Sequence, residues 1–166
     1  LLLTWVTPLL AQQSGFLSVP LTSKEGMVEW TVTSSNGSIS VPATVPGQVT
    51  LDLKEAGLLA DPLYRFNDVE YRWAARDDYT YTASLELPAA MITKSALEVV
   101  FDGLDTVCNI SVNGHLLAST SNMYTRHIVS LASVVDSTTT KLDFSLAFDD
   151  PVAAAKARRE RDIDEN

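Results

Sequence analysis

The chain has 166 residues, a size that suits one domain built around a single hydrophobic core. Its residues are 46% hydrophobic and 20% charged, a composition that excludes wholesale disorder. The formal net charge of −9 argues against nucleic acid and anionic membranes as partners, because both attract clustered Lys and Arg. With one cysteine, Cys108, the chain forms no internal disulfide.

The first eleven residues form an apolar run that ends in Ala and is followed by polar residues. The run has signal-peptide length and is too short to cross a bilayer as a helix. We therefore interpret residues 1–20 as a signal-peptide remnant with its lead-in, while a buried first strand would show a similar pattern. A signal implies the secretory pathway, with an extracellular, lysosomal or vacuolar destination. Sequons at Asn36 and Asn109 would accept glycans there.

Alternation of apolar and polar residues predicts most of the chain as β-strands. The clearest runs are residues 79–87, in which Tyr79 and Tyr81 face inward, and residues 141–148. Residues 96–104 predict a more continuously apolar strand. Further short strands are expected within residues 26–33, 38–43 and 126–135.

Residues 106–119 predict a hairpin whose two strands meet at Asn113-Gly114. This dipeptide accepts the positive φ angles of a type I′ turn. The alternation places Cys108 inward, as an unreactive core thiol, and Asn109 outward, where a glycan has room.

One short helix is expected after the turn at residues 45–47, because Val49, Leu53 and Ala56 have helical spacing and Gly57 suits a C-cap. Residues 151–166 form a polar tail, helical or disordered, with little apolar face to pack. The basic residues of this tail alternate with acidic ones, which is typical of a solvated helix face rather than a binding patch.

About eight short strands and no regular alternation with long helices predict an all-β fold. We expect residues 21–150 to form an antiparallel jelly-roll β-sandwich with one short helix. A parallel α/β fold is excluded by the same pattern.

Residues that could carry chemistry are sparse. Two histidines and one cysteine lack metal-ligand spacing, and neither a phosphate-binding glycine cluster nor a nucleophile elbow is present, so we expect no metal and no cofactor. The adjacent carboxylates Asp77-Asp78 and Asp149-Asp150 would point to opposite faces of a strand. They are therefore interpreted as solvated turn residues rather than as the paired acids of a glycosidase.

Five motifs follow one another in a single register: the Val-Pro-Gly turn at 45–47, the aromatic loop at 61–73, the segment at 101–106, the Asn-Gly hairpin, and residues 122–127. Over residues 26–155 the chain resembles the N-terminal domain of β-mannosidases of glycoside hydrolase family 2. Family-2 β-galactosidases and β-glucuronidases are similar only through the segment at 101–106 and the Asn-Gly turn.

The resemblance implies a galactose-binding-like sandwich that packs against a (β/α)₈ barrel and walls its active site. In such enzymes two barrel glutamates remove terminal β-linked mannose with retention of configuration. A barrel needs about 250 residues, so no catalytic residue is expected in this chain, and the chain by itself is predicted to be inactive. The family's Trp-Asp-Trp segment, which reaches the mannose site, does not follow residue 155 before Asn166.

The candidate site is the aromatic loop before the strand at 79–87. The resemblance implies that five of its residues lie near the substrate or the barrel: Tyr64, Phe66, Asn67, Asp68 and Trp73. Two structural alternatives remain open. In the first, the rings of Tyr64, Phe66 and Trp73, together with that of Tyr71, close the end of the sandwich without contacting a ligand. In the second, Asn67 and Asp68 form an Asx-type turn that shapes the loop, and Arg65 and Arg72 form ion pairs with Asp68 and Glu70.

Three functions are consistent with this sequence. The first is the scaffold domain of a β-mannosidase, whose partner is the catalytic barrel and whose substrate is a terminal β-mannoside. The others are a free carbohydrate-binding module that uses the aromatic loop, and an interaction domain without enzymatic activity.

Overall fold

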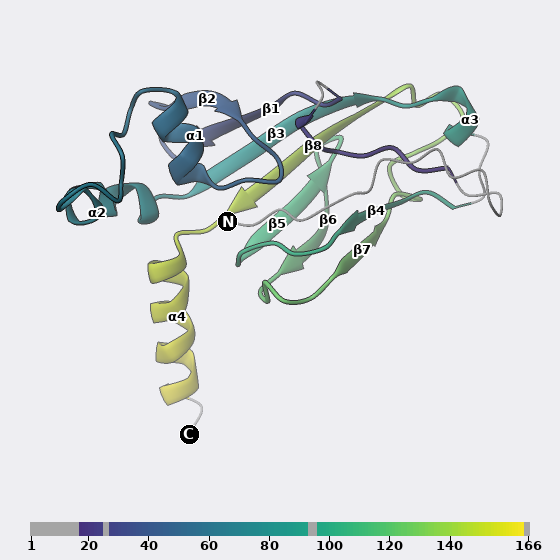
Figure 1. Ribbon diagram of the computed structural model, residues 1–166. Helices are drawn as coiled ribbons and strands as arrows, with labels where there is room; N and C mark the ends of the chain where they lie inside the picture. Colours follow the sequence, from purple (N-terminus) through teal and green to yellow (C-terminus); the bar gives the residue numbers. More distant parts are fainter. Residues whose placement is uncertain (1–16, 25–26, 93–95, 165–166) are drawn as a thin grey trace.

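The computed structural model describes residues 17–24, 27–92 and 96–164, and it shows two antiparallel sheets around one core (Figure 1). The signal-peptide interpretation of residues 1–11 falls outside the described residues. One sheet has six strands in the order β2-β1-β3-β8-β5-β6, and the other pairs β4 with β7. The strands are β1 (Trp30–Ser34), β2 (Ser40–Ala43), β3 (Tyr79–Glu86), β4 (Glu98–Phe101), β5 (Cys108–Val112), β6 (His115–Thr120), β7 (His127–Ser130) and β8 (Lys141–Phe148). The predicted all-β sandwich is confirmed.

The pair β3–β8 forms the centre of the large sheet, and all eight residues of each strand are paired. Alternation along these strands buries Tyr79 and Tyr81 as predicted. The Tyr81 ring meets the Phe148 ring edge-on, with centroids 5.9 Å apart, a geometry that aromatic pairs prefer.

The predicted hairpin is also present. Asn113 and Gly114 have φ angles of 50° and 78°, as a type I′ turn requires. Cys108 is buried and Asn109 is exposed on opposite faces of β5. Burial, aided by the charge of Asp149, raises the pKa of the Cys108 thiol to about 12, so the thiolate needed for reaction does not form near neutral pH.

The second sheet is shorter than the sequence predicted. β4 covers only Glu98–Phe101, and its burial alternates instead of being continuous. Val99 and Phe101 face the core, whereas Val100 pairs with Ile128 on a solvent-facing side. A two-stranded sheet has only one face on the core, so the apolar run at 96–104 could not be buried on both sides.

Helical segments are more numerous than the one early helix and the helical or disordered tail that were predicted. α1 (Val49–Glu55) is that helix, and it ends before Gly57, whose φ of 75° terminates it as expected. The others are α2 (Asn67–Glu70), the 3₁₀ helix η2 (Tyr71–Ala75), α3 (Ala89–Ile92) and α4 (Pro151–Asp164). Among the described residues, no helix combines the length and the apolar character that crossing a bilayer demands.

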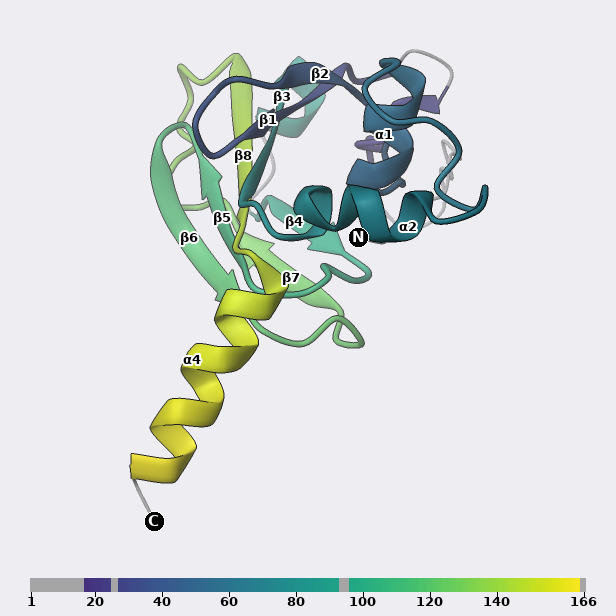
Figure 2. The ribbon, with the colours of Figure 1, turned by 90° about the vertical axis from the view of Figure 1, so that its left-hand side faces the viewer.

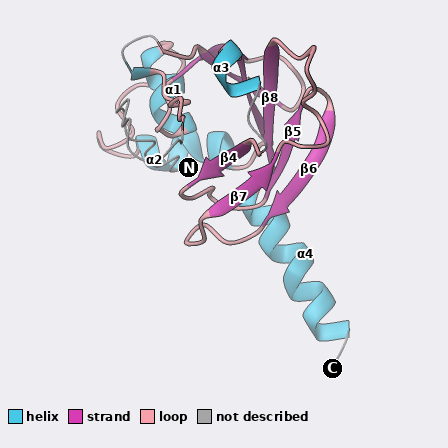
Figure 3. Ribbon diagram, turned by 90° about the vertical axis from the view of Figure 1, so that its right-hand side faces the viewer, coloured by secondary structure: helices cyan, strands magenta, loops and turns pink. Residues whose placement is uncertain are grey.

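The helices are distributed unevenly around the sandwich. α1, α2 and the start of α4 gather at one end, which faces the viewer in Figure 2. α3 lies at the opposite end in Figure 1, and α4 projects away from the sheets in every view, including Figure 3.

A buried carboxylate fastens α1 to the large sheet. Asp52 is only 1% exposed. Its Oδ1 accepts a hydrogen bond from the Thr44 backbone N–H at 2.8 Å, and its Oδ2 accepts one from the Tyr81 hydroxyl at 3.0 Å. Desolvation raises the pKa of Asp52 above its ordinary value of 3.8, although both hydrogen bonds oppose the shift.

This shift predicts a pH-dependent effect of Asp52→Asn. Because the folded chain holds the Asp52 proton more tightly than the unfolded chain, the carboxyl stabilises the fold most below pH 3.8 and this contribution is lost as the pH rises through the raised pKa. The free energy of unfolding of Asp52→Asn, measured in urea, should therefore increase relative to the unsubstituted chain between pH 3.5 and 7.

Two variants act as controls for this prediction. Asp52→Ala leaves the buried Tyr81 hydroxyl and the part-buried Thr44 N–H without their acceptor and should cost about 2 kcal/mol or more at every pH. Asp68→Asn removes an exposed carboxylate and should change little. A constant difference between Asp52→Asn and the unsubstituted chain across this pH range would contradict the raised pKa.

Candidate functional site

Three aromatic rings stand exposed at the α2 end of the sandwich. Tyr64, Phe66 and Trp73 are 58%, 77% and 44% exposed, and we call these three residues the aromatic rim. Leu63 and Val69 are exposed beside them in the chain. Large apolar side chains that are concentrated in one exposed segment mark an interaction surface more often than singly scattered ones do.

Local hydrogen bonds at Asp61 shape the loop that carries the rim. Asp61 Oδ1 accepts a hydrogen bond from the Leu63 backbone N–H at 3.0 Å, which forms an Asx turn. The Asp61 carbonyl accepts from Asn67 Nδ2 at 2.7 Å and from the Tyr64 backbone N–H at 3.1 Å. The Asx turn is therefore at Asp61, and the prediction of one at Asn67 and Asp68 is wrong because these residues begin α2.

The predicted ion pairs in the loop are wrong as well. Among the described residues, which include all four partners, neither Arg65 nor Arg72 forms an ion pair with Asp68 or Glu70. Arg65 instead lies with its guanidinium 5.1 Å from the centre of the Tyr64 ring, a cation–π distance. α2 and η2 turn the chain so that the charged side chains separate.

The aromatic residues of the loop divide into two groups. Tyr71 is half-buried, packs against the core, and its hydroxyl accepts a hydrogen bond from the Ala60 backbone N–H at 3.1 Å. Tyr71 is thus a local plug. The three rim rings do not plug the sandwich in this way, because each exposes close to half of its surface or more.

Asn67 and Asp68 lie on α2, between the rings of the rim in sequence. One N–H of the Asn67 amide is engaged with the Asp61 carbonyl, so its Oδ1 and its second N–H remain to contact a ligand. Asp68 is exposed. Both residues can accept hydrogen bonds from hydroxyl groups, but nothing in their geometry pairs two carboxylates across a bond.

The adjacent carboxylates serve turns and a helix cap, as their turn interpretation predicted. Asp77 Oδ1 accepts hydrogen bonds from the Ser35 hydroxyl at 2.5 Å and from the Asp78 backbone N–H at 2.9 Å. Asp78 Oδ1 accepts one from the Asp150 N–H at 2.5 Å, and Asp150 Oδ1 accepts one from the Val152 N–H at 2.8 Å, which caps α4. No group of three or more His, Cys, Asp and Glu side chains in the described ranges could hold a metal ion.

A shallow groove of about 720 Å³ crosses the outer face of the large sheet. Thr31, Thr82, Ser84 and Ser145 contribute hydroxyl groups to it, and the only ring in its lining is that of Phe144, which is buried in the core. The groove therefore offers no exposed ring on which a sugar could stack.

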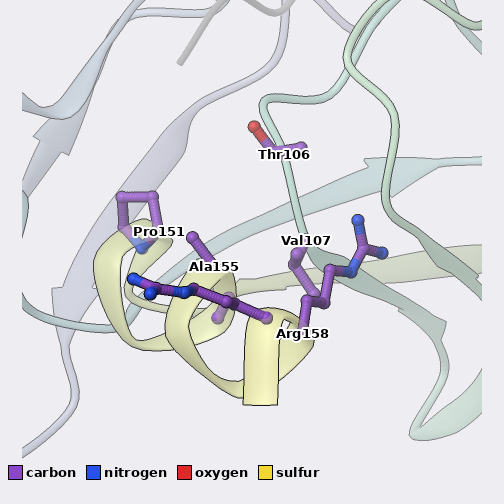
Figure 4. A pocket seen from close by; sticks show the side chains of 7 residues that line it. Thr106, Val107, Pro151, Ala155 and Arg158 are labelled. Carbon is purple, nitrogen blue, oxygen red and sulfur yellow. The ribbon is translucent and has the colours of Figure 1, made fainter. Parts of the chain in front are cut away.

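The sequence did not reveal a second groove, at the base of α4. It has a volume of about 550 Å³ and lies between residues Thr106 and Val107 on one side and the first turns of α4 on the other (Figure 4). Arg158 and Arg159 line it. Only the position of α4 in space brings these arginines to the loop before β5, so no local signal in the sequence could have predicted it.

Comparison with known proteins identifies the family. The family model described as "Glycosyl hydrolase 2 galactose-binding domain-like" matches residues 30–165, and the chain therefore belongs to this family. The chain is 40% identical to "Beta-mannosidase" of Mus musculus over 119 residues, which are 71% of this chain and 14% of that protein. It is 37% identical to "Beta-mannosidase" of Bos taurus over 132 residues, or 80% of this chain and 15% of that protein.

A solved structure is consistent with these relatives. The "Beta-D-Mannosidase" of Dictyoglomus thermophilum superimposes with a TM-score of 0.74 at 25% identity, covering 78% of this chain and 16% of that one. The resemblance seen in the sequence is thus confirmed. The chain spans only a small part of the length of each relative.

The exposure of the rim predicts that its rings contribute little to the stability of this chain. Replacing Tyr64, Phe66 and Trp73 together by Ser should change the free energy of unfolding by less than about 1.5 kcal/mol, because one surface substitution usually changes it by about 0.5 kcal/mol or less. It should also reduce binding of the dye ANS, which reports exposed apolar surface. Trp30→Ala, in the core, is the contrasting variant and should cost about 3–5 kcal/mol.

Proposed function

We propose that the chain is the N-terminal, non-catalytic sandwich domain of a β-mannosidase. The whole enzyme would hydrolyse terminal non-reducing β-D-mannose residues from β-mannosides and glycoprotein-derived oligosaccharides by a retaining mechanism. The family membership and the β-mannosidase relatives support this proposal.

The observation that carries the proposal is the exposed aromatic rim. A domain gains free energy when such rings are covered, at about 25 cal/mol for each Å² of apolar surface removed from water. In the proposed enzyme the (β/α)₈ barrel covers Tyr64, Phe66 and Trp73. Asn67 and Asp68, on the same segment, would then face the sugar-binding side and accept hydrogen bonds from its hydroxyl groups.

The catalytic acids belong to the barrel in this proposal. Asp52 is buried in the core, Asp77, Asp78 and Asp150 serve turns and a helix cap, and the geometry of the aromatic loop pairs no two carboxylates across a bond. The chain by itself should therefore release no 4-nitrophenol from 4-nitrophenyl β-mannoside, with a β-mannosidase such as the mouse relative as the positive control. Turnover that persists in the purified chain would overturn the proposal.

The alternative of a free carbohydrate-binding module is tested by titration calorimetry with mannose and mannobiose. The proposed scaffold domain should show negligible heat, since the sugar site is completed by the barrel. Saturable heat that disappears in the Trp73→Ser variant would favour the binding module instead. An interaction domain without enzymatic activity would instead bind a separate protein over the rim.

Entry into the secretory pathway remains a proposal, and the two sequons offer its test. Asn36 and Asn109 are both exposed, and Asn109 Oδ1 accepts a hydrogen bond from the Ser119 hydroxyl at 2.6 Å, which turns its Nδ2 away from that partner. Secreted from a eukaryotic host, the chain should show two glycans removable by peptide:N-glycosidase F. Asn36→Gln and Asn109→Gln should each remove one. If peptide:N-glycosidase F leaves the gel mobility of the unsubstituted chain unchanged, the prediction is contradicted.

A further inference from the structure

α4 extends from the sandwich with almost no packing to hold it. Of its side chains from residue 151 to 161, only Ala154 is half-buried and the others are exposed. Isolated helices of about 12–15 residues are marginal in water, and α4 has 14. Contacts beyond those within the described residues would therefore stabilise it.

Hydrogen bonds hold the loop wall of the groove at the base of α4 and the first turn of that helix. On the loop side, the Thr106 carbonyl accepts a hydrogen bond from the Thr120 hydroxyl and the Val107 carbonyl accepts one from the Asp149 N–H, both at 3.1 Å. On the helix side, the Asp150 cap fixes the first turn of α4. These hydrogen bonds thus fix the loop wall and the start of the helix wall.

The chemistry of the groove combines an apolar lining with two cations. Val107, Pro151, Ala154 and Ala155 supply the apolar surface. Arg158 and Arg159 lie beside it, and the side chain of Arg158 extends next to Val107 (Figure 4).

Neither arginine of the groove is neutralised by an acid among the described residues. Within the described part of the chain neither arginine has an ion-pair partner, whereas Lys156 on the same helix lies 3.9 Å from Glu160. The alternating charges of the tail thus neutralise Lys156 but leave two guanidinium groups beside the groove. Both arginines are exposed, in agreement with the solvated face that the sequence predicted, and what the sequence did not show is the groove beside them.

We propose that the groove binds an extended, acidic segment of polypeptide. Guanidinium groups bind carboxylates through paired, charge-assisted hydrogen bonds, so Arg158 and Arg159 would each take an Asp or Glu side chain. Small aliphatic side chains between the acids would cover Val107 and Ala155. A volume of about 550 Å³ is within the range of ligand pockets.

The segment is assigned to the neighbouring domain of the enzyme, an assignment that rests on the proposed function. α2 and the first turn of α4, which lines the groove, lie at the same end of the sandwich in the end-on view of Figure 2. A neighbour that covers the aromatic rim is therefore placed to reach the groove as well. The segment would tie α4 to that neighbour.

The test uses the chain as it is, with a fluorescein-labelled peptide Ala-Glu-Leu-Glu-Ala and its counterpart Ala-Lys-Leu-Lys-Ala. Fluorescence anisotropy should show saturable binding of the acidic peptide only. Replacing Arg158 and Arg159 by Ala should weaken binding about tenfold or more, because two charge-assisted contacts are lost. The matched variant Arg161→Ala, on the same helix outside the groove, should bind within about twofold of the parent. Amide NMR shifts should change at Val107 and Ala155.

Four results would overturn the proposal: no binding of the acidic peptide, equal loss in Arg161→Ala, shifts confined to other surfaces, or inorganic phosphate binding as tightly as the peptide. Sedimentation showing a dimer that the double variant abolishes would assign the groove to a second copy of the chain instead. None of these measurements depends on mannosidase activity. A negative result for peptide binding can therefore be distinguished from a negative result for the proposed function.

Discussion

The buried carboxylate of Asp52 connects three parts of the chain that are distant in sequence. It receives hydrogen bonds from the loop after β2 and from Tyr81 at the centre of the large sheet, while belonging to α1 itself. Leu53, the next residue of α1, is fully buried in the core. Because the loop that carries the aromatic rim continues from α1, the position of the rim depends on this attachment. Burying a carboxylate costs desolvation free energy, and its hydrogen bonds hold α1 in one position against the sheet.

The end of the sandwich that carries α2 and the base of α4 has two surfaces that a partner could cover. The rim exposes aromatic carbon, and the groove beside Arg158 exposes apolar walls and positive charge. The outer face of the large sheet differs from both, since its groove is lined largely by hydroxyl and carboxylate side chains that water solvates well. A domain with this distribution is suited to joining a neighbour at one end while the sheet face remains in solvent.

The strands were predictable from the sequence because alternation of apolar and polar residues is a local property. All eight expected segments contain a strand, and the turn at Asn113-Gly114 and the end of α1 at Gly57 follow from the φ angles that those residues tolerate. The aromatic loop was harder to predict. Its division into a plug, Tyr71, and an exposed rim depends on how α2 and η2 orient each ring, which residue type alone does not fix.

The sequence by itself therefore determined the fold class, the core faces of β3 and β8, and the family to which the domain belongs. Those features depend on periodicity and on motifs that are read along the chain. Only the tertiary structure decided that Asp52 is buried, that Arg65 lies over Tyr64 instead of pairing with an acid, and that α4 forms a groove with the loop before β5. These depend on contacts between residues far apart in sequence, whose geometry is set by packing of the whole domain.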